Sequence, residues 1–224
     1  MPDAVTTAPA APTVVDFDTL GSYERYKLMA SLIVPRPIAL VTTLGPDGVV
    51  NAAPFSMFAM VGEDPPLVMI SVNRLDDGQQ KDTVTNIEAS QEFVVHLVDE
   101  PIARQMHACG TRYPAHVDEL ATVGFTAAPS DLVGCPRIAE APVAFECTLA
   151  EQMTTASRHV YFGRIRRLHA RPGLVDTETW RVRLQDYAPV GRFGASFYTG
   201  TRERFSLASD DVGEGARVTE IDEF

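Results

Sequence analysis

The stretch Pro35–Asn86 decides the fold, and it reads PRPIALVTTLGPDGVVNAAPFSMFAMVGEDPPLVMISVNRLDDGQQKDTVTN. It holds three apolar runs of β-forming residues, Ile38–Leu44, Val49–Ala53 and Leu67–Val72, separated by Pro-Asp-Gly and Asp-Pro-Pro turn signals. A polar loop then leads to a predicted helix start at Lys81-Asp82-Thr83, where Asp82 or Thr83 is expected to cap the helix. Strands that end beside a helix N-terminus carrying a lysine and hydroxyls suit a phosphate-bearing ligand.

The flanking segments add predicted helices and further strands. An amphipathic helix is predicted over Asp16–Ile33, where two prolines end it, and Phe55–Met60 is either a short helix or a distorted strand. In Val143–Ala150, alternation places Glu146 outward and Cys147 inward, and Gly163 predicts a bulge in the strand after it. The remaining expected helices are Asp82 or Thr83 to Ala89, Pro101–Ala108, Asp118–Val123 and a short one over Asp176–Arg183, and the remaining strands are Phe93–Val98 and Arg158–Leu168.

These elements predict one mainly β domain. Six or so strands, mostly joined to near neighbours with helices inserted between them, favour a closed or nearly closed antiparallel barrel. We expect this domain to span residues 16–208. A disordered arm rich in Ala, Pro and Thr is expected at residues 1–15, and an acidic flexible tail at 209–224.

Composition narrows the function. The net charge of −11 argues against nonspecific binding to nucleic acid or an anionic membrane, so an anionic cofactor would need a local basic cluster. Three cysteines without a CxxC pair suit a reducing cytoplasm. No apolar run approaches the ~20 residues needed to cross a bilayer, and the N-terminus lacks a secretory pattern. We therefore expect a cytoplasmic protein without nucleic-acid or membrane partners.

Several familiar site motifs are absent. The chain has no GxGxxG, no P-loop and no GxSxG nucleophile motif. His107, Cys109 and His116 lie close together in sequence but lack an HExxH pattern or a carboxylate partner, so no metal site is predicted. No catalytic side chain is predicted either.

Two short segments are candidates for ligand binding. Lys81 offers a charge, Thr83 a hydroxyl and the first helical turn free amides; the alternative is an ordinary solvated helix start. The small residues in Asn51–Ser56 admit a flat ligand, although a tight barrel corner would use them equally well. Together with Ser71 at the end of a strand, these segments favour one shared pocket.

The combined pattern RPIALVTT…NAAPFSxF…DPP…KDT…NI…EFVVHLV resembles the flavin reductase-like, FMN-binding split-barrel family, in its flavoredoxin-like branch. The resemblance covers roughly residues 26–207. Later segments that also resemble the family are Arg112-Tyr113-Pro114, Val117-Asp118-Glu119, Pro136-Arg137-Ile138, Glu146-Cys147 and Pro189–Gly194.

The resemblance implies a six-stranded antiparallel Greek-key split barrel with flanking helices, a homodimer, and FMN (FAD is the alternative) near the subunit interface. Matching positions imply that Asn51, Ala53 and Ser56 border the flavin ring and ribityl chain. They also imply that Ser71, Lys81, Asp82 and Thr83 hold the ribityl and phosphate end, and that Arg36 and Arg74 add positive charge for the phosphate. Tyr113, Arg192 and Tyr198 are implied to close the site, from this subunit or its partner. The alternatives are a structural ion pair for Arg36 and dimer packing for the last three.

The implied activity is hydride transfer from NADH or NADPH to flavin, with reduced flavin supplied to a partner monooxygenase. In such proteins the flavin performs the transfer, while protein groups bind and orient it. A flavin-binding electron carrier without efficient nicotinamide turnover is the alternative. A third, weaker hypothesis is a barrel that binds another ligand.

Overall fold

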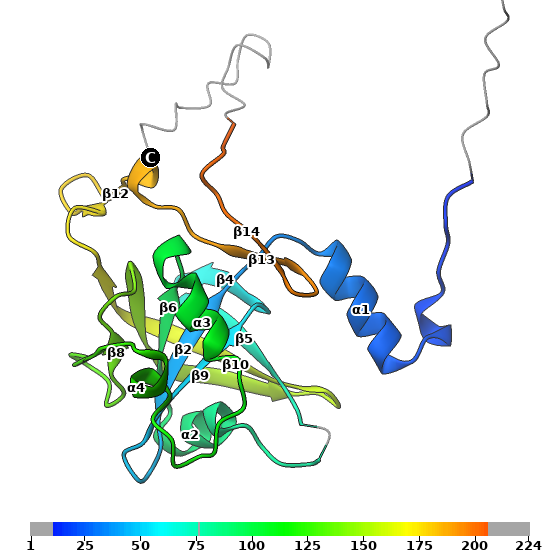
Figure 1. The fold of residues 1–224 in the computed structure, drawn as a ribbon, viewed down its shortest axis with the longest axis horizontal. Helices are drawn as coiled ribbons and strands as arrows, with labels where there is room; N and C mark the ends of the chain where they lie inside the picture. The colour runs from blue at the N-terminus through cyan, green and yellow to red at the C-terminus, as the bar shows by residue number, and fades with distance from the viewer. Residues whose placement is uncertain (1–10, 76, 206–224) are drawn as a thin grey trace, which may run out of the picture.

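The computed structural model describes residues 11–75 and 77–205, and its centre is a seven-stranded sheet (Figure 1). Every neighbouring pair is antiparallel, in the order β3-β2-β6-β9-β10-β5-β4. The strands are β2 (Ala39–Leu44), β3 (Val50–Phe55), β4 (Phe58–Glu63), β5 (Pro66–Asn73), β6 (Glu92–Leu97), β9 (Val143–Thr154) and β10 (Arg158–Ala170). The predicted six strands become seven because the ambiguous segment after Phe55 forms a strand of its own, β4. Most of the predicted arm and the predicted tail lie outside the described residues.

The sheet curls into a barrel with one open seam. Its edge strands β3 and β4 are joined by Ser56 and Met57 but do not pair with each other in the part of the chain that the structure describes. The amide of Ser71 in β5 donates to the carbonyl of Met57, 2.9 Å away, and fixes this link against the sheet. The seam therefore lies beside the small residues of β3.

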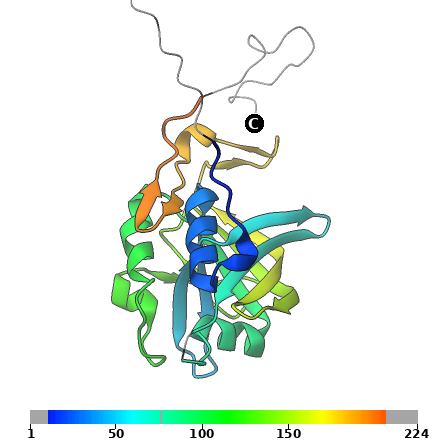
Figure 2. The same ribbon diagram turned by 90° about the vertical axis from the view of Figure 1, so that its right-hand side faces the viewer.

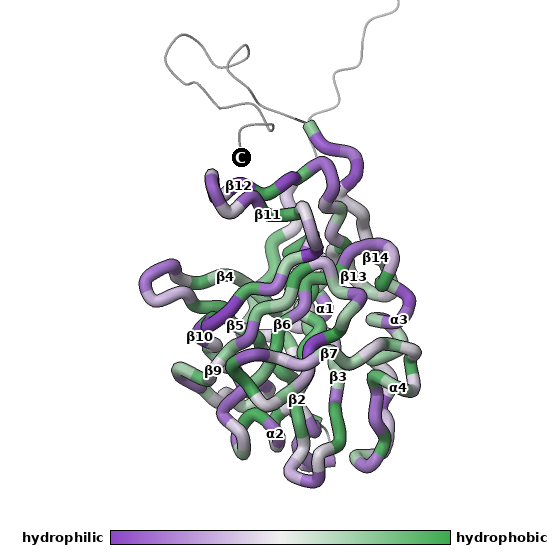
Figure 3. Tube along the Cα trace, turned by 90° about the vertical axis from the view of Figure 1, so that its left-hand side faces the viewer, coloured by the Kyte–Doolittle hydropathy of each residue, from purple (hydrophilic) through white to green (hydrophobic). Residues whose placement is uncertain are grey.

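The core occupies both faces of the central strands. Inside the barrel, Val41, Phe93 and Cys147 belong to one buried cluster, whereas Leu40 packs outside with Met106. The strand β2 is therefore covered on both sides. Figure 3 shows the hydrophobic residues along the central strands and hydrophilic ones at the β4–β5 tip and around β12.

A bulge lies at Gly163 as predicted, but its extra residue is Ala150 of the partner strand β9 rather than a residue of β10. The pairing of β10 with β9 shifts register between Phe162 and Gly163. A Cβ on Gly163 would lie 2.4 Å from the Phe93 ring, so only glycine fits where β10 approaches that ring.

Helices surround the barrel unevenly. Helix α2 (Asp82–Ser90) lies below the strands and α3 (Ala103–Ala108) covers one side, whereas α1 (Ser22–Leu32) stands apart from the sheet (Figures 1 and 2). The predicted first helix begins later than expected, because the short turn η1 (Phe17–Thr19) precedes it. The other helical segments are η2 (Glu100–Ile102), α4 (Glu119–Val123) and η3 (Leu184–Asp186). No helix in the described ranges is long and apolar enough to cross a membrane.

Short strands complete the fold. β1 (Arg36–Pro37), β13 (Gly191–Gly194) and β14 (Phe197–Thr199) form a small sheet, and β7 (Ala127–Ala128) pairs with β8 (Arg137–Ile138). The helix predicted over Asp176–Arg183 is wrong, because β11 (Val175–Asp176) and β12 (Arg181–Val182) pair as a hairpin there. The Asp176 carboxylate accepts bonds from the Glu178 amide and the Thr179 hydroxyl, which stabilises a turn instead.

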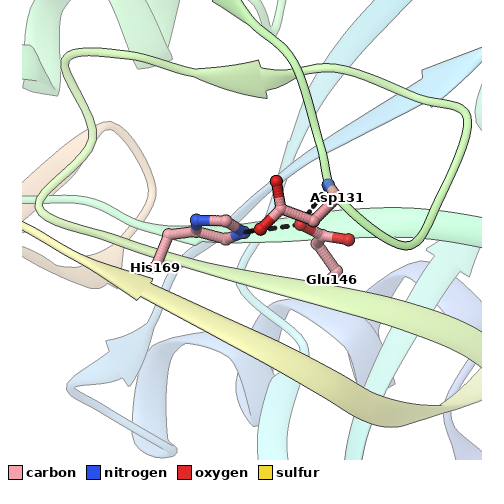
Figure 4. Close-up of side chains that lie close together, drawn as sticks. All are labelled: Asp131, Glu146 and His169. Carbon is pink, nitrogen blue, oxygen red and sulfur yellow. Dashed lines mark hydrogen bonds and ion pairs between the residues drawn. The ribbon is translucent and has the colours of Figure 1, made fainter.

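Glu146 on β9 corrects a second prediction, because this supposedly outward side chain is fully buried. Its carboxylate accepts a hydrogen bond from the Asp131 amide at 2.8 Å and contacts the Nε2 of His169 at 2.5 Å (Figure 4). It also accepts a hydrogen bond from the Leu132 amide at 2.6 Å. Burial acts to raise the pKa of Glu146, but the bonds from the Asp131 amide, His169 and the Leu132 amide outweigh it and hold that pKa below its ordinary value. Glu146 therefore anchors the loop that covers this face of the sheet.

Candidate functional site

Two cavities adjoin at the open seam of the barrel. The α2 cavity, about 390 Å³, lies between β3, the N-terminus of α2 and the segment 109–119. The α1 cavity, about 550 Å³, lies between α1, α3 and the β13–β14 hairpin. Both are lined by Pro54, Gly110 and Thr111, so they share a wall.

The structure distributes the predicted site residues between these cavities. The residues that line the α2 cavity are Asn51, Ala53, Lys81, Asp82, Thr83 and Tyr113. Those that line the α1 cavity are Arg36, Ser56, Arg192 and Tyr198. Two residues lie outside both: Ser71 is buried in β5, and Arg74 is exposed in the loop that follows it.

The first turn of α2 offers free hydrogen-bond donors to the α2 cavity. Lys81, not the predicted Asp82 or Thr83, occupies the N-cap position, and no side chain among the described residues caps the helix there. The amides of Val84 and Thr85 bond to the Lys81 carbonyl, which leaves the amides of Asp82 and Thr83 without an intrahelical acceptor. These amides and the positive end of the helix dipole favour an anion.

Positive charge gathers at the same place although the chain is acidic overall. Burial first, and then the charges of Arg158 and Arg112, lower the pKa of Lys81. The Lys81 ammonium lies 5.8 Å from the centre of the Phe55 ring. Arg112 already pairs with Asp77 at 3.1 Å, whereas Lys81 has no carboxylate within 4.0 Å in the described ranges. An anion at the helix start would satisfy this charge.

A buried polar network fixes the wall between β3 and α2. The side-chain amide of Asn51 donates to the hydroxyls of Thr83 and Thr43, at 3.0 and 3.2 Å. The amide of Asn86 donates to the same Thr43 hydroxyl at 3.0 Å. Because the Thr83 oxygen accepts from Asn51, its hydroxyl hydrogen is left to donate.

Glu119 is a cavity residue that the sequence did not reveal as one. Its carboxyl lines the α2 cavity and accepts a hydrogen bond from the Ala52 amide at 2.9 Å. Burial is the main cause that raises the pKa of Glu119 to about 7, so the group is partly protonated at neutral pH. In sequence, Asp118-Glu119 has the pattern of acidic residues at a helix start, but only Asp118 caps α4, by accepting from the Ala121 amide.

Cys109 lines the same cavity without the properties of a nucleophile. Burial and the neighbouring Glu119 raise the pKa of its thiol to about 12. A thiol with such a pKa stays protonated at neutral pH, and the thiolate is the reactive form. Cys109 therefore lacks the thiolate that a cysteine nucleophile needs.

The α1 cavity is built around two arginines and an aromatic group. Arg36 donates to the carbonyls of Ala30 and Ile33, in the last turn of α1 and just after it, and its Nε lies 3.4 Å from the Ser56 hydroxyl. Within the described ranges no carboxylate lies within 4.0 Å of the Arg36 guanidinium, so the alternative of a structural ion pair is not found there. Arg192 stacks over the Tyr198 ring at 4.7 Å.

Comparison with known proteins identifies the fold. A family model described as a flavin reductase like domain matches residues 29–186. The structure of a putative flavin reductase with a split barrel domain from Shewanella frigidimarina is similar, with a TM-score of 0.72 at 21% identity, over 86% of this chain and 95% of that one. This likeness supports the fold alone, and the predicted mainly β split barrel is confirmed.

Two further solved structures are more similar in sequence. The 2-nitrobenzoate 2-nitroreductase NbaA of Pseudomonas fluorescens shares 38% identity with a TM-score of 0.81, over 91% of this chain and all of that one. Nitrilotriacetate monooxygenase component B of Bacillus cereus shares 29% identity with a TM-score of 0.83, over 89% of this chain and all of that one.

Proposed function

The chain belongs to the flavin reductase-like family, and we propose that it is an FMN-dependent oxidoreductase that takes its electrons from NADH or NADPH. The family and its structural neighbours imply flavin binding and oxidoreductase activity. The observation that carries the choice of FMN is the uncapped start of α2, with Lys81 beside it, at the wall of a cavity in an acidic chain.

The donor set fits a phosphate. Two unpaired amides, the Lys81 ammonium and the Thr83 hydroxyl belong to one helical turn, and Arg158 and Arg112 add positive charge nearby. A phosphomonoester accepts several charge-assisted bonds at such a place, each stronger than a neutral hydrogen bond. Riboflavin lacks this group, so the turn would select the phosphorylated flavin.

Under this proposal, β3 borders the ring end of the flavin. Asn51 and Ala53 line the cavity with Pro54, and Glu119 holds the Ala52 amide behind them. The small side chains let a flat group approach the strand, and Tyr113 lines the same cavity. Bound flavin supplies the hydride and electron transfer, so these residues need only bind it, orient it and exclude water.

We also propose a homodimer whose partner subunit covers α1. Tyr23 and Leu32 are 69% and 74% exposed, and Phe197 in the neighbouring hairpin is 68% exposed. Tyr23 lines the α1 cavity, and Leu32 and Phe197 belong to the helix and hairpin that border it, so a second copy that covered these apolar side chains would also close that cavity. This is the arrangement expected of a site completed between subunits.

The electron acceptor has two candidates. The name of component B supports a partner monooxygenase that receives reduced flavin, as the resemblance implied. The name of NbaA supports a second function, direct reduction of a small aromatic compound, and the aromatic residues that line the α1 cavity favour it.

Anaerobic mixing tests the proposed activity. The purified protein, loaded with FMN, is mixed with NADH or NADPH while the visible absorbance of the flavin is followed. Rapid bleaching with one nucleotide supports the oxidoreductase and identifies its donor. Bleaching by dithionite but by neither nucleotide would instead support the electron carrier, and failure to bind flavin would reject both.

A further inference from the structure

We propose that the α1 cavity binds a small anionic aromatic compound, with its carboxylate between Arg36 and Arg192 and its ring against Tyr198. The inference rests on the proposed function, since the adjoining α2 cavity would hold the flavin that reduces this compound. It assigns these two arginines to a different anion from the FMN phosphate.

The first argument is an uncompensated pair of like charges. Arg36 in β1 and Arg192 in β13 are direct partners in the antiparallel ladder, so their side chains share a face. Like charges in that position repel each other. The pKa of Arg36 is lowered mainly by burial; Tyr26 acts to raise it, and the charge of Arg192 acts to lower it.

Neither arginine has an acid to balance it in the described part of the chain. Arg36 donates to carbonyl oxygens and faces the Ser56 hydroxyl, and Arg192 donates to the carbonyl of Ala195. The other guanidinium groups with nearby carboxylates, such as Arg171 with Asp99 at 3.1 Å, show that acids are available elsewhere. An anion between the two arginines would remove their repulsion and accept from two planar donors.

The second argument is the shape and chemistry of the walls. Tyr23, Tyr26 and Tyr198 line the α1 cavity together with Ile38 and Pro54. Tyr198 is fixed by Arg192 over its ring and by His107, whose Nδ1 lies 2.9 Å from the Tyr198 hydroxyl. Aromatic side chains pack well against a flat apolar ring, and the two guanidinium groups beside them suit one negative group on that ring. A sugar or an aliphatic chain would match these walls less well.

The third argument is the connection to the flavin site. Pro54, Gly110 and Thr111 line both cavities. A Cβ on Gly110 would lie 3.1 Å from the His107 carbonyl oxygen and 3.7 Å from Pro54 Cγ, and would therefore thicken the shared wall. Glycine keeps this boundary thin, so a ring in the α1 cavity lies next to the place proposed for the flavin.

Calorimetry with benzoate and with benzamide, its neutral isostere, tests the proposal. Both are titrated into FMN-loaded wild type, Arg192→Gln, and the control Arg104→Gln, which changes an exposed arginine of α3 outside the cavity. We expect benzoate to bind wild type more tightly than benzamide, and Arg192→Gln to weaken benzoate binding by about tenfold or more. FMN affinity should be unchanged, and the control should behave as wild type.

Arg36→Lys provides a second variant that keeps the charge but loses the planar fork. It should weaken benzoate binding less than Arg192→Gln does. Equal affinity for benzoate and benzamide, or unchanged benzoate binding in Arg192→Gln, would overturn the proposal. An increased KM for NADH without a change in benzoate binding would assign the arginines to the dinucleotide phosphates instead.

The same titration on flavin-free protein separates the two proposals. Benzoate binding there would support the α1 cavity site even if the wild type failed to bind FMN, an outcome that rejects only the proposed flavin function.

Discussion

The side-chain amide of Asn51 donates a hydrogen bond to the hydroxyl of Thr83, 3.0 Å away, and so ties β3 to the first turn of α2. Both residues are buried, at 8% and 1% exposure. In the proposed complex, β3 borders the flavin ring and α2 holds the phosphate. This bond, together with the Thr43 hydroxyl that Asn51 and Asn86 share, would therefore fix the spacing between the ring end and the phosphate end of the site.

Substitution of Thr83 by valine should weaken FMN binding. Valine keeps the shape of the side chain but removes the hydroxyl that Asn51 contacts and that would donate to phosphate. One lost hydrogen bond of this kind corresponds to roughly a tenfold rise in Kd, measurable by quenching of flavin fluorescence. Thr85→Val, at an exposed position of the same helix, is the control. Equal Kd values for wild type and Thr83→Val would remove Thr83 from the site.

The stability of the protein should depend on Glu119 in a defined pH range. Its pKa is about 7 in the folded protein and about 4.5 when unfolded, so between these values the folded state binds more protons. The free energy of unfolding should therefore fall by about 3 kcal/mol as pH rises from 4.5 to 7. Glu119→Gln removes this contribution while its amide oxygen still accepts from Ala52.

Other groups titrate in the same pH range, so the quantity to measure is the difference in the free energy of unfolding between wild type and Glu119→Gln. Burial lowers the pKa of His96 to about 4, and its contribution to stability changes with pH in the opposite direction. Urea unfolding of wild type and Glu119→Gln at several pH values cancels such groups. The variant should become progressively more stable relative to wild type as pH rises to 7. A constant difference would show that the pKa of Glu119 is not raised.

Glu146→Gln should destabilise the fold. The carboxylate accepts from two backbone amides and from His169, whereas a glutamine has one acceptor oxygen and places an NH₂ group against a donor. We expect a loss of about 2–3 kcal/mol in the free energy of unfolding, measured in urea. Glu151→Gln, exposed on the same strand, should change stability by less than about 0.5 kcal/mol. Equal stabilities would mean that this anchor is dispensable.

Leu32→Glu should convert the proposed homodimer to a monomer. A glutamate at this exposed apolar position of α1 would be buried without a partner when two copies associate. Sedimentation velocity should show a dimer for wild type and for Leu132→Glu, which alters an exposed leucine of the loop held by Glu146. A monomeric wild type at micromolar concentration would contradict the proposal.

Much of the fold could be predicted because its signals are local. The turns around the first strands and the glycine bulge at Gly163 require particular residues at particular positions, and these are visible in sequence. Glu146 was misplaced because a distant loop covers the outer face of its strand, which alternation cannot reveal. The segment after Asp176 was misread because its side chain stabilises a turn that outweighs helix propensity.

In the candidate site, too, the features with a local sequence pattern could be predicted and those that depend on distant residues could not. Lys81 and Thr83 were visible because a helix start is a local pattern. Glu119 was not, because its role depends on a cavity formed by β3 and α2, far away in sequence. The division of the predicted residues between two cavities likewise depends on where α1 and the β13–β14 hairpin lie.

The affinities of FMN and riboflavin for wild type and Lys81→Gln test the central claim most directly. The two ligands differ only by the phosphate, and glutamine removes the charge from Lys81 while keeping a polar side chain. Wild type should prefer FMN, and the substitution should weaken FMN binding roughly ten- to a hundredfold while leaving riboflavin binding unchanged. Equal affinity of wild type for both flavins, or an equal loss of affinity for both in the variant, would contradict a phosphate-binding site at the start of α2.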